Sequence, residues 1–347
     1  MQSITGKENN LPMTPFLNQL RPWVSVICTS YNHEAFVTDA LHSVVAQCYP
    51  NIELIVIDNA STDSTADRIQ AFVQQHPAVV FIRNAENIGL CRAFNQGLKL
   101  AGGRYVIDLS ADDVLLPGRI ARQVAFFERL PESYAVVFTN AGYINPAGRL
   151  LGYHYPINEK GQARQKVPSG NVFRHVLESY FICTPTMMIR KEVLDAIGGY
   201  DETLWFEDFD FWIRTSRHYQ YAYLDEVLTH KRHLDDSLSR QVIRSDNRIL
   251  HSTLQVCYKA FDHCETPDEY RTLARRVRRF LRKCFYAEQF DLALQFGKLL
   301  QYMEEPDPIT AAILLLCRLR VPVNGAYRRY IQCRNYPRLL RLKANLT

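Results

Sequence analysis

The chain has 347 residues, of which 47% are hydrophobic and 22% are charged; this balance excludes disorder as the default and leaves room for one large core or two smaller ones. The formal net charge of +5 is unevenly divided. Residues 240–347 hold 20 Lys and Arg against 10 Asp and Glu, which gives 20 − 10 = +10, and the remaining 21 against 26 give −5. Such a basic tail suits an anionic partner, either phospholipid headgroups or a phosphorylated acceptor, and equally a solvated basic surface.

The cysteines and the apolar segments indicate in which cellular compartment the protein is expected. Nine scattered cysteines without a Cys-x-x-Cys pair predict a reducing environment and no structural zinc. Residues 1–22 form a polar lead-in that lacks the apolar core of a signal peptide. The longest apolar stretch, 311–317, is too short to span a bilayer. We therefore expect a cytoplasmic protein, with peripheral attachment to the inner face of the membrane as an option that the basic tail leaves open.

From residue 23 onward, short runs rich in β-branched residues alternate with helical patterns, which is typical of a mostly parallel sheet covered by helices. The pattern predicts strands at 24–29, 52–58, 79–83, 105–109 and 135–139, and helices at 34–47, 64–75, 90–101 and 117–129. Runs such as ELIVID are apolar on both faces. They fit central strands with helices on each side.

The second half of the chain is less regular. Residues 140–180 are rich in turn formers and predict a loop region, followed by strands at 186–189 and 221–224 and helices at 191–197 and 207–217. From about residue 240 the pattern is helical and basic. We therefore divide the chain into the lead-in (1–22), an α/β domain (23–239, with a first half at 23–140 and a second at 141–239) and a basic helical region (240–347).

Polar residues follow three of the predicted strands, at 29–32, 58–63 and 110–113. Ligands of open α/β sheets bind at the carboxyl ends of strands, so these segments are the first candidates for a site. A single acidic residue there is more often a helix cap or a turn former, but three such ends together favour a site. One or two carboxylates can hold a hard cation such as Mg²⁺ or Mn²⁺, which would neutralise a diphosphate leaving group. Asp112 is the first choice as ligand.

Three segments, in this order, resemble the family-two glycosyltransferases of the GT-A fold: VSVICTSYNHEAFVTDALHSVVAQCYPNIELIVIDNASTD, ENIGLCRAFNQGLKLAGGRYVIDLSADDVLLP and IGGYDETLWFEDFDFWIR. The resemblance covers roughly residues 23–235. It implies a Rossmann-like αβα sandwich with a mostly parallel sheet, a nucleotide-sugar donor, for which a UDP-sugar is favoured, and Mn²⁺ or Mg²⁺ as cofactor. The helical tail lies outside it.

The resemblance also implies donor-binding positions, and these are Thr29, Tyr31, Asn32, Asp58, Asn87, Asn95, Ser110, Ala111 and Asp112. Among them, Asp58 matches the acidic residue that hydrogen-bonds the base. Ser110 stands where the family usually has the leading aspartate of Asp-x-Asp, which leaves metal binding to Asp112 and puts the usual donor contact of the leading position in doubt.

Residues 205–208 match the Glu-Asp pair of the family, which implies that Asp208 is the general base of an inverting enzyme. The chemistry independently requires such a group, because the attacking acceptor hydroxyl must lose a proton. Trp205 and Glu207 are assigned to the acceptor side or to support of the loop. The first turn of a helix also favours acidic residues, so a purely structural role is the alternative for Glu207 and Asp208.

Two residues after the last predicted strand complete the candidate site. His233 falls where many family members place a histidine that can reach the metal or the diphosphate, and a surface histidine is the alternative. Arg232 is assigned to acceptor binding or support, and its guanidinium would also suit a diphosphate.

The sequence thus predicts a metal-dependent, inverting glycosyltransferase of bacterial surface polysaccharide or glycolipid synthesis. Its partners would be a nucleotide-sugar, a glycan or lipid-linked acceptor and an anionic membrane surface, without nucleic acid. A non-catalytic nucleotide-sugar-binding or scaffold protein is the alternative, which would need no base at position 208. A nucleotidyltransferase is weaker, because the segment CTSYNHEAF has neither glycine nor lysine to hold a triphosphate.

Overall fold

The computed structural model describes residues 21–234, 248–325, 327 and 329, so most of the predicted lead-in and the end of the basic region lie outside the described residues. Contacts divide the described chain into two units. The sheet unit holds the residues up to Gly170, Ile182–Tyr200 and Gln220–Arg232. The helical unit holds Asn171–Phe181, Asp201–Tyr219 and the residues from His233 onward. The predicted boundary at residue 239 divides the chain into consecutive segments, and it stays a prediction. The two units, in contrast, each combine segments from different parts of the sequence.

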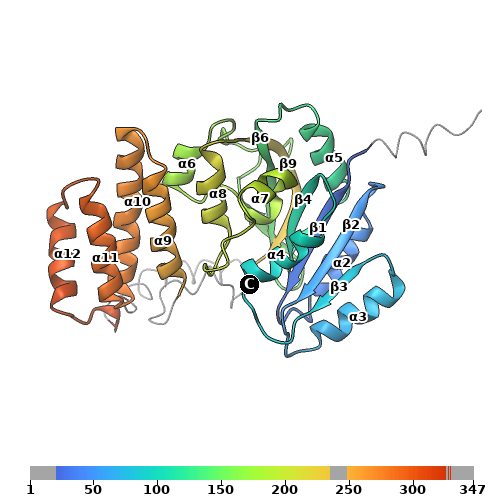
Figure 1. Ribbon diagram of the computed structural model, residues 1–347, viewed down its shortest axis with the longest axis horizontal. Coiled ribbons are helices and arrows are strands. Elements are labelled where there is room, and N and C mark those ends of the chain that lie inside the picture. Colours follow the sequence, from blue (N-terminus) through green and yellow to red (C-terminus); the bar gives the residue numbers. More distant parts are fainter. Residues whose placement is uncertain (1–20, 235–247, 326, 328, 330–347) are drawn as a thin grey trace, which may run out of the picture. The chain divides into compact units, whose positions relative to one another are not determined.

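The sheet unit contains one nine-stranded sheet in the order β3-β2-β1-β4-β8-β6-β9-β5, with β7 paired to β6. The strands are β1 (Val24–Ser30), β2 (Ile52–Asp58), β3 (Val80–Arg83), β4 (Tyr105–Ser110), β5 (Val114–Leu115), β6 (Tyr134–Ile144), β7 (Leu150–Tyr153), β8 (Met188–Arg190) and β9 (Gln220–Arg232). The strands β3, β2, β1 and β4 pair in parallel, as do β6 and β9, whereas β5, β7 and β8 run antiparallel to their neighbours. The expected mostly parallel sheet is confirmed (Figure 1).

Apolar strands and helices build the core of this unit. Its helices are α2 (Val37–Val45), α3 (Thr65–Gln75), α4 (Leu90–Leu100), α5 (Arg119–Phe127), α7 (Lys191–Ala196) and the short 3₁₀ helix η1 (Thr184–Thr186). All seven residues of β1 are buried, as a strand covered on both faces requires. Helix α4 approaches β1 closely at Gly97, where a Cβ would lie 2.6 Å from Cγ2 of Ile27.

The helical unit contains α6 (Phe173–Glu178), α8 (Asp208–Ser216), α9 (Ile249–Asp262), α10 (Pro267–Tyr286), α11 (Phe290–Gln301) and α12 (Pro308–Arg318). Helix α10 begins with a capping box, in which the Thr266 hydroxyl accepts from the Glu269 N–H and the Glu269 carboxylate accepts from the Thr266 N–H. Pro267 occupies the first helical position, where its missing N–H costs little. None of the helices in the described ranges is both long and apolar enough to cross a membrane.

The predicted loop at 140–180 is wrong in its first and last parts. Strand β6 continues to Ile144 because Ala141 and Ile144 are buried, and a turn with Gly148 at φ +79° then leads into β7. Helix α6 forms at the end of the segment, with Phe173, Val176 and Leu177 buried. Strand β9 is also longer than the predicted 221–224, since it pairs with β6 from Gln220 to Arg232. The expected strand positions are otherwise confirmed to within a few residues.

Candidate active site

The loops after β1 and β2 are joined through Asn32. Its Oδ1 accepts from the Thr62 N–H at 2.8 Å and lies 3.2 Å from the Thr62 hydroxyl, and its own N–H donates to Oγ of Ser61 at 2.9 Å. Asn32 has a left-handed backbone (φ +56°), which asparagine tolerates better than most residues. Beside it, Thr29 is buried and Tyr31 is 44% exposed. The predicted nucleotide segment is therefore held in one conformation by side chain to backbone bonds.

Asp58 ends β2 and is fully buried. Its Oδ2 accepts from the Ser61 N–H at 3.2 Å, and its Oδ1 accepts from the hydroxyls of Ser61 at 2.5 Å and Ser30 at 3.4 Å. Strand β2 pairs with β1 so that Ser30 lies opposite Asp58. The carboxylate therefore holds the two strand-end loops together, and its predicted contact with a base stays a prediction.

A cluster of amides orders the loop between β3 and α4. The Asn59 Nδ2 donates to Oδ1 of Asn87 at 2.9 Å, and the Asn59 Oδ1 accepts from the Ile88 N–H at 3.1 Å and from Nδ2 of Asn84 at 3.2 Å. Asn87 also accepts from the Gly89 N–H at 3.0 Å. The sequence analysis named Asn87, and it included Asn59 only as part of the candidate segment 58–63. It missed Asn84, although an asparagine directly after a strand was a visible signal.

Asn95 lies in α4 and binds the backbone of Tyr200. Its Nδ2 donates to the Tyr200 carbonyl at 2.8 Å and its Oδ1 accepts from the Tyr200 N–H at 2.9 Å. The Tyr200 ring stacks on Phe94 with centroids 4.2 Å apart. The amide thus fixes the turn at Gly198 and Gly199, and direct donor contact by Asn95 stays a prediction.

Replacing Gly199 with alanine is expected to destabilise the protein more than replacing Gly198. Both glycines have positive φ, at +78° and +73°, so both variants pay a similar backbone cost of about 1–2 kcal/mol. Only at Gly199 would a Cβ meet Oδ1 of Asn95, at 2.4 Å, whereas Gly198 faces open space. We expect a further loss of about 1–3 kcal/mol for Gly199→Ala in urea unfolding. Equal losses for the two variants would refute the role of this close approach.

The segment after β4 places Asp112 and Ser110 together. The Ser110 hydroxyl donates to Oδ1 of Asp112 at 2.5 Å, and the N–H of the buried Ala111 donates to the Thr29 carbonyl at 3.1 Å. Asp112 is half-buried, whereas Asp113 is 3% exposed. Burial, reinforced by the Asp112 charge and partly offset by Lys231, raises the pKa of Asp113 to about 8. Of the two neighbouring carboxyl groups, Asp112 is thus the one suited to hold a cation.

Arg232 supports this segment from the end of β9. It is 5% exposed, and its guanidinium donates to the backbone carbonyls of Asp112 at 3.0 Å, Pro146 at 2.8 Å and Asn145 at 3.3 Å. Its own N–H donates to Oδ1 of Asp113 at 2.9 Å. These bonds tie Arg232 to the loop after β4, and its roles toward an acceptor or a diphosphate stay predictions.

The remaining predicted residues belong to the helical unit. Asp208 is the first residue of α8, is half-buried, and accepts from the Phe209 N–H at 2.6 Å. Glu207 occupies the position before the helix, where its carbonyl accepts from the Phe211 N–H. Trp205 is 49% exposed, and its N–H donates to Oγ of Ser252 at 3.0 Å. The helix-start geometry considered from the sequence is therefore present at Asp208.

The predicted metal ligands fall in different units, Asp112 in the sheet unit and His233 in the helical unit. Among the described residues, no three or more His, Cys, Asp or Glu side chains group around a point that would suit a metal ion. A single carboxylate still fits Mg²⁺ or Mn²⁺, because such ions in phosphate sites take one or two carboxylates and complete their shell with phosphate oxygens and water. The Asp112 carboxylate beside the Ser110 hydroxyl is an oxygen donor set of this kind.

An ion-pair network links α8 to α9 and to Asp201, and the sequence analysis did not predict it. Lys259 of α9 lies 2.6 Å from both Asp210 and Asp201, and Arg214 lies 2.7 Å from Asp210. Asp210 is 1% exposed, so its charge needs these partners. Burial acts to raise the pKa of Asp201, but hydrogen bonds from Lys259 and Thr203 outweigh it and hold the pKa at about 2. The network fixes the helix that Asp208 begins.

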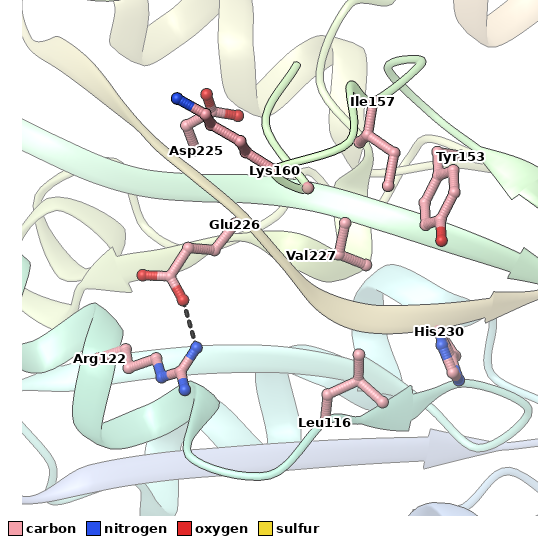
Figure 2. A pocket seen from close by; sticks show the side chains of 10 residues that line it. Leu116, Arg122, Tyr153, Ile157, Lys160, Asp225, Glu226, Val227 and His230 are labelled. Atoms are coloured by element: carbon pink, nitrogen blue, oxygen red, sulfur yellow. Dashed lines mark hydrogen bonds and ion pairs between the residues drawn. The ribbon is translucent and has the colours of Figure 1, made fainter.

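A cavity of about 380 Å³ lies in the sheet unit between β9, the end of β5 and the segment after β7. Figure 2 shows the ion pair of Arg122 with Glu226 at one side and the ring of Tyr153 at another. Its lining consists of Leu116, Arg122, Tyr153, Ile157, Lys160, Gly161, Asp225, Glu226, Val227 and His230. None of the predicted site residues is among them, so this cavity is separate from the strand-end residues described above.

Comparisons with known proteins identify the family of the chain. Residues 25–198 match the model of the family described as Glycosyl transferase family 2. The chain is 34% identical over 131 residues, 38% of this chain and 51% of the relative, to TuaG of Bacillus subtilis, a glycosyltransferase named for teichuronic acid biosynthesis.

Two solved structures share the fold. TarS of S. aureus, residues 1–349 in complex with UDP-GlcNAc, matches with a TM-score of 0.63 and 18% identity over 88% of this chain and 92% of that chain. The mannosyltransferase PcManGT of Pyrobaculum calidifontis, in complex with GDP-Man and Mn²⁺, matches with a TM-score of 0.54 and 18% identity over 90% and 84%. At this identity the likeness establishes the fold, and the expected GT-A fold is confirmed.

Proposed function

The chain belongs to glycosyl transferase family 2, and from this membership we propose that it transfers a sugar from a nucleotide-diphosphate donor to an acceptor hydroxyl with inversion at the anomeric carbon. The observation that best supports this reaction is the Ser110–Asp112 pair at the carboxyl end of β4. The neighbouring β1 and β2 end in the Asn32 and Asp58 loops, and the three strands are adjacent and parallel. This is the edge at which open α/β sheets bind nucleotides.

The donor would bind at these loops. The exposed ring of Tyr31 is free to stack on a base, while Asn32 and Asp58 keep the surrounding backbone fixed. Asp112 would hold Mg²⁺ or Mn²⁺, which supplies charge neutralisation for the leaving diphosphate. Support comes from the relatives of known fold, one bound to UDP-GlcNAc and one to GDP-Man with Mn²⁺. We favour a UDP-sugar as donor.

Asp208 would take the proton from the acceptor hydroxyl. Asp208 begins α8, and its carboxylate, which accepts from the Phe209 N–H, is the kind of group that a general base needs. We assign Trp205 and Glu207, which precede it, to the acceptor side or to support of the loop. Asn87 and Asn95 act by ordering the loops near the donor. We assign His233, by its position in the sequence, to the metal or the diphosphate.

We further propose that the acceptor is a glycan or a lipid-linked glycan of a bacterial surface polysaccharide, met at the inner face of the membrane. The name of TuaG, which refers to teichuronic acid biosynthesis, supports this setting.

A product assay tests the reaction. Purified protein with Mn²⁺ or Mg²⁺ is expected to release nucleoside diphosphate from one of the UDP-, GDP- or dTDP-sugars, and a thermal-shift screen of the same donors identifies which one binds. Binding of one donor without release of nucleoside diphosphate in the presence of candidate acceptors would favour the non-catalytic alternative. Release of pyrophosphate from a nucleoside triphosphate would favour a nucleotidyltransferase.

A further inference from the structure

One face of α10 carries four cations without a carboxylate partner. The helix holds seven Arg and Lys residues against two acidic residues, Asp268 and Glu269. Arg271 lies 3.7 Å from Asp268, and Arg278 pairs with Glu304 and Asp307. No ion pair of Arg275, Arg276, Arg279, Arg282 or Lys283 occurs among the described residues. At 3.6 residues per turn, four of these five fall within an arc of about 100°, with Arg282 directly beside it. We call Arg275, Arg276, Arg279 and Lys283 the cationic face.

The hydrogen-bond partners of the cationic face are neutral groups, although the charges of Asp268 and Glu178 act on Arg275 and Arg279. Arg275 donates to Oγ1 of Thr272 at 2.9 Å, and Arg279 donates to the Glu178 carbonyl at 2.6 Å. The Lys283 Nζ lies 5.1 Å from the centroid of the Phe280 ring. Burial, together with Arg276 and Arg279, lowers the pKa of Lys283, and burial with Arg276 likewise lowers that of Arg279, with Glu178 opposing. The four cations therefore repel one another in the unbound protein, and an anion would relieve this repulsion.

Arg276 is the recessed member of the cationic face, since it is 2% exposed. Its guanidinium carbon lies 3.8 Å from the centroid of Phe209 and 4.2 Å from that of Tyr180. Nη1 donates to the Val176 carbonyl at 2.5 Å and lies 3.4 Å from the Leu177 carbonyl. These carbonyls and the two rings offset part of the cost of burying the charge. Since Phe209 directly follows Asp208, the cationic face adjoins the start of α8.

We propose that the cationic face binds phosphate groups of the acceptor, so that the acceptor is a phosphate-bearing glycan held beside the beginning of α8. This inference rests on the proposed function, because it assigns the acceptor side to the helical unit. Guanidinium groups suit phosphate through charge-assisted hydrogen bonds, and three exposed cations spaced by four residues present a row that can contact successive phosphates. The row lies along α10 at Arg275, Arg279 and Lys283.

A phosphate-bearing chain fits the cationic face better than a membrane surface does. Helices that bind at a bilayer surface insert exposed apolar side chains beside their cations. Helix α10, all of whose residues are described, exposes no large hydrophobic side chain.

Inorganic triphosphate is a direct probe of the cationic face. It is titrated by calorimetry into the full-length protein in EDTA, so that neither a donor sugar nor a divalent metal takes part. The variant Arg275→Gln/Arg279→Gln/Lys283→Gln removes three exposed charges and leaves the buried Arg276 in place. The control Arg271→Gln/Lys298→Gln/Arg318→Gln removes the same charge from exposed positions elsewhere in the helical unit.

We expect the cationic-face variant to lose about tenfold or more in affinity for triphosphate and to show a weaker salt dependence, while the control changes by about twofold at most. Equal affinity in the two variants would overturn the proposal. A second result would also overturn it. In that result the wild type binds vesicles of equal parts phosphatidylcholine and phosphatidylglycerol but not triphosphate, and the cationic-face variant loses the vesicle binding. Such a result would indicate a membrane surface. Because the probe contains no sugar, failure of sugar transfer and failure of this binding are separate results.

Discussion

Replacing Asp208 with asparagine is expected to lower kcat by on the order of 10²–10⁴-fold, the contribution of a positioned general base. Asparagine has nearly the same shape, and its Oδ1 can still accept from the Phe209 N–H, so the start of α8 should remain intact. Steady-state kinetics with the identified donor measures the loss. Calorimetric titration of the donor should give a dissociation constant within about twofold of the wild type, since a base acts in the transition state rather than in donor binding.

The neighbouring Glu207→Gln variant is the matched control for Asp208→Asn. It removes one charge from the position just before α8, whose backbone carbonyl remains bonded to Phe211. If Glu207 only supports the loop, its variant should keep most of the activity and the melting temperature. A kcat for Asp208→Asn within tenfold of the wild type would contradict the assignment of the base.

The Asp112→Asn variant is expected to lose the metal-dependent part of donor affinity, about 3 kcal/mol or on the order of a hundredfold in Kd. The amide can still accept from the Ser110 hydroxyl, so the loop after β4 should keep its shape while the negative charge is lost. Titrations with Mn²⁺ and with EDTA separate the two parts: the variant with Mn²⁺ should bind the donor as weakly as the wild type in EDTA.

Ser110→Ala is the companion to Asp112→Asn. It removes the hydroxyl that donates to Asp112 but leaves the carboxylate, so the expected loss is only about 1 kcal/mol. If the wild type binds the donor equally well with Mn²⁺ and with EDTA, Asp112 is not a metal ligand.

The parallel part of the fold could be predicted from the sequence because it follows local patterns. Strands β1 and β2 are short runs rich in Val and Ile next to helical segments, and their bounds were predicted almost to the residue. The family could be predicted from three ordered motifs, and the match to the family model confirms it. The extension of β6 could not be predicted, because Asn140 and Gly142 interrupt its apolar pattern. The strand stays extended there because it pairs with β9, which is distant in the sequence.

The supporting side chains could not be predicted, because their partners are far away in the sequence. Asn95 binds Tyr200 and Arg232 binds the backbone of Asp112, separations of 105 and 120 residues. The basic region is expected to face an anionic partner or solvent, but its Arg276 is buried against the rings of Phe209 and Tyr180. A helix with cations on several faces does not reveal which of them the neighbouring aromatic residues will cover.

The interleaving of the two units limits how this protein could be shortened or recombined. The chain passes from one unit to the other after residues 170, 181, 200, 219 and 232, so α6 and α8 are inserted between strands of the sheet unit. A fragment ending near residue 239 would keep α8 but lose α9, and the buried Asp210 would then be without Lys259. Exchange of the C-terminal helices among relatives should therefore succeed only when the inserted helices are exchanged with them.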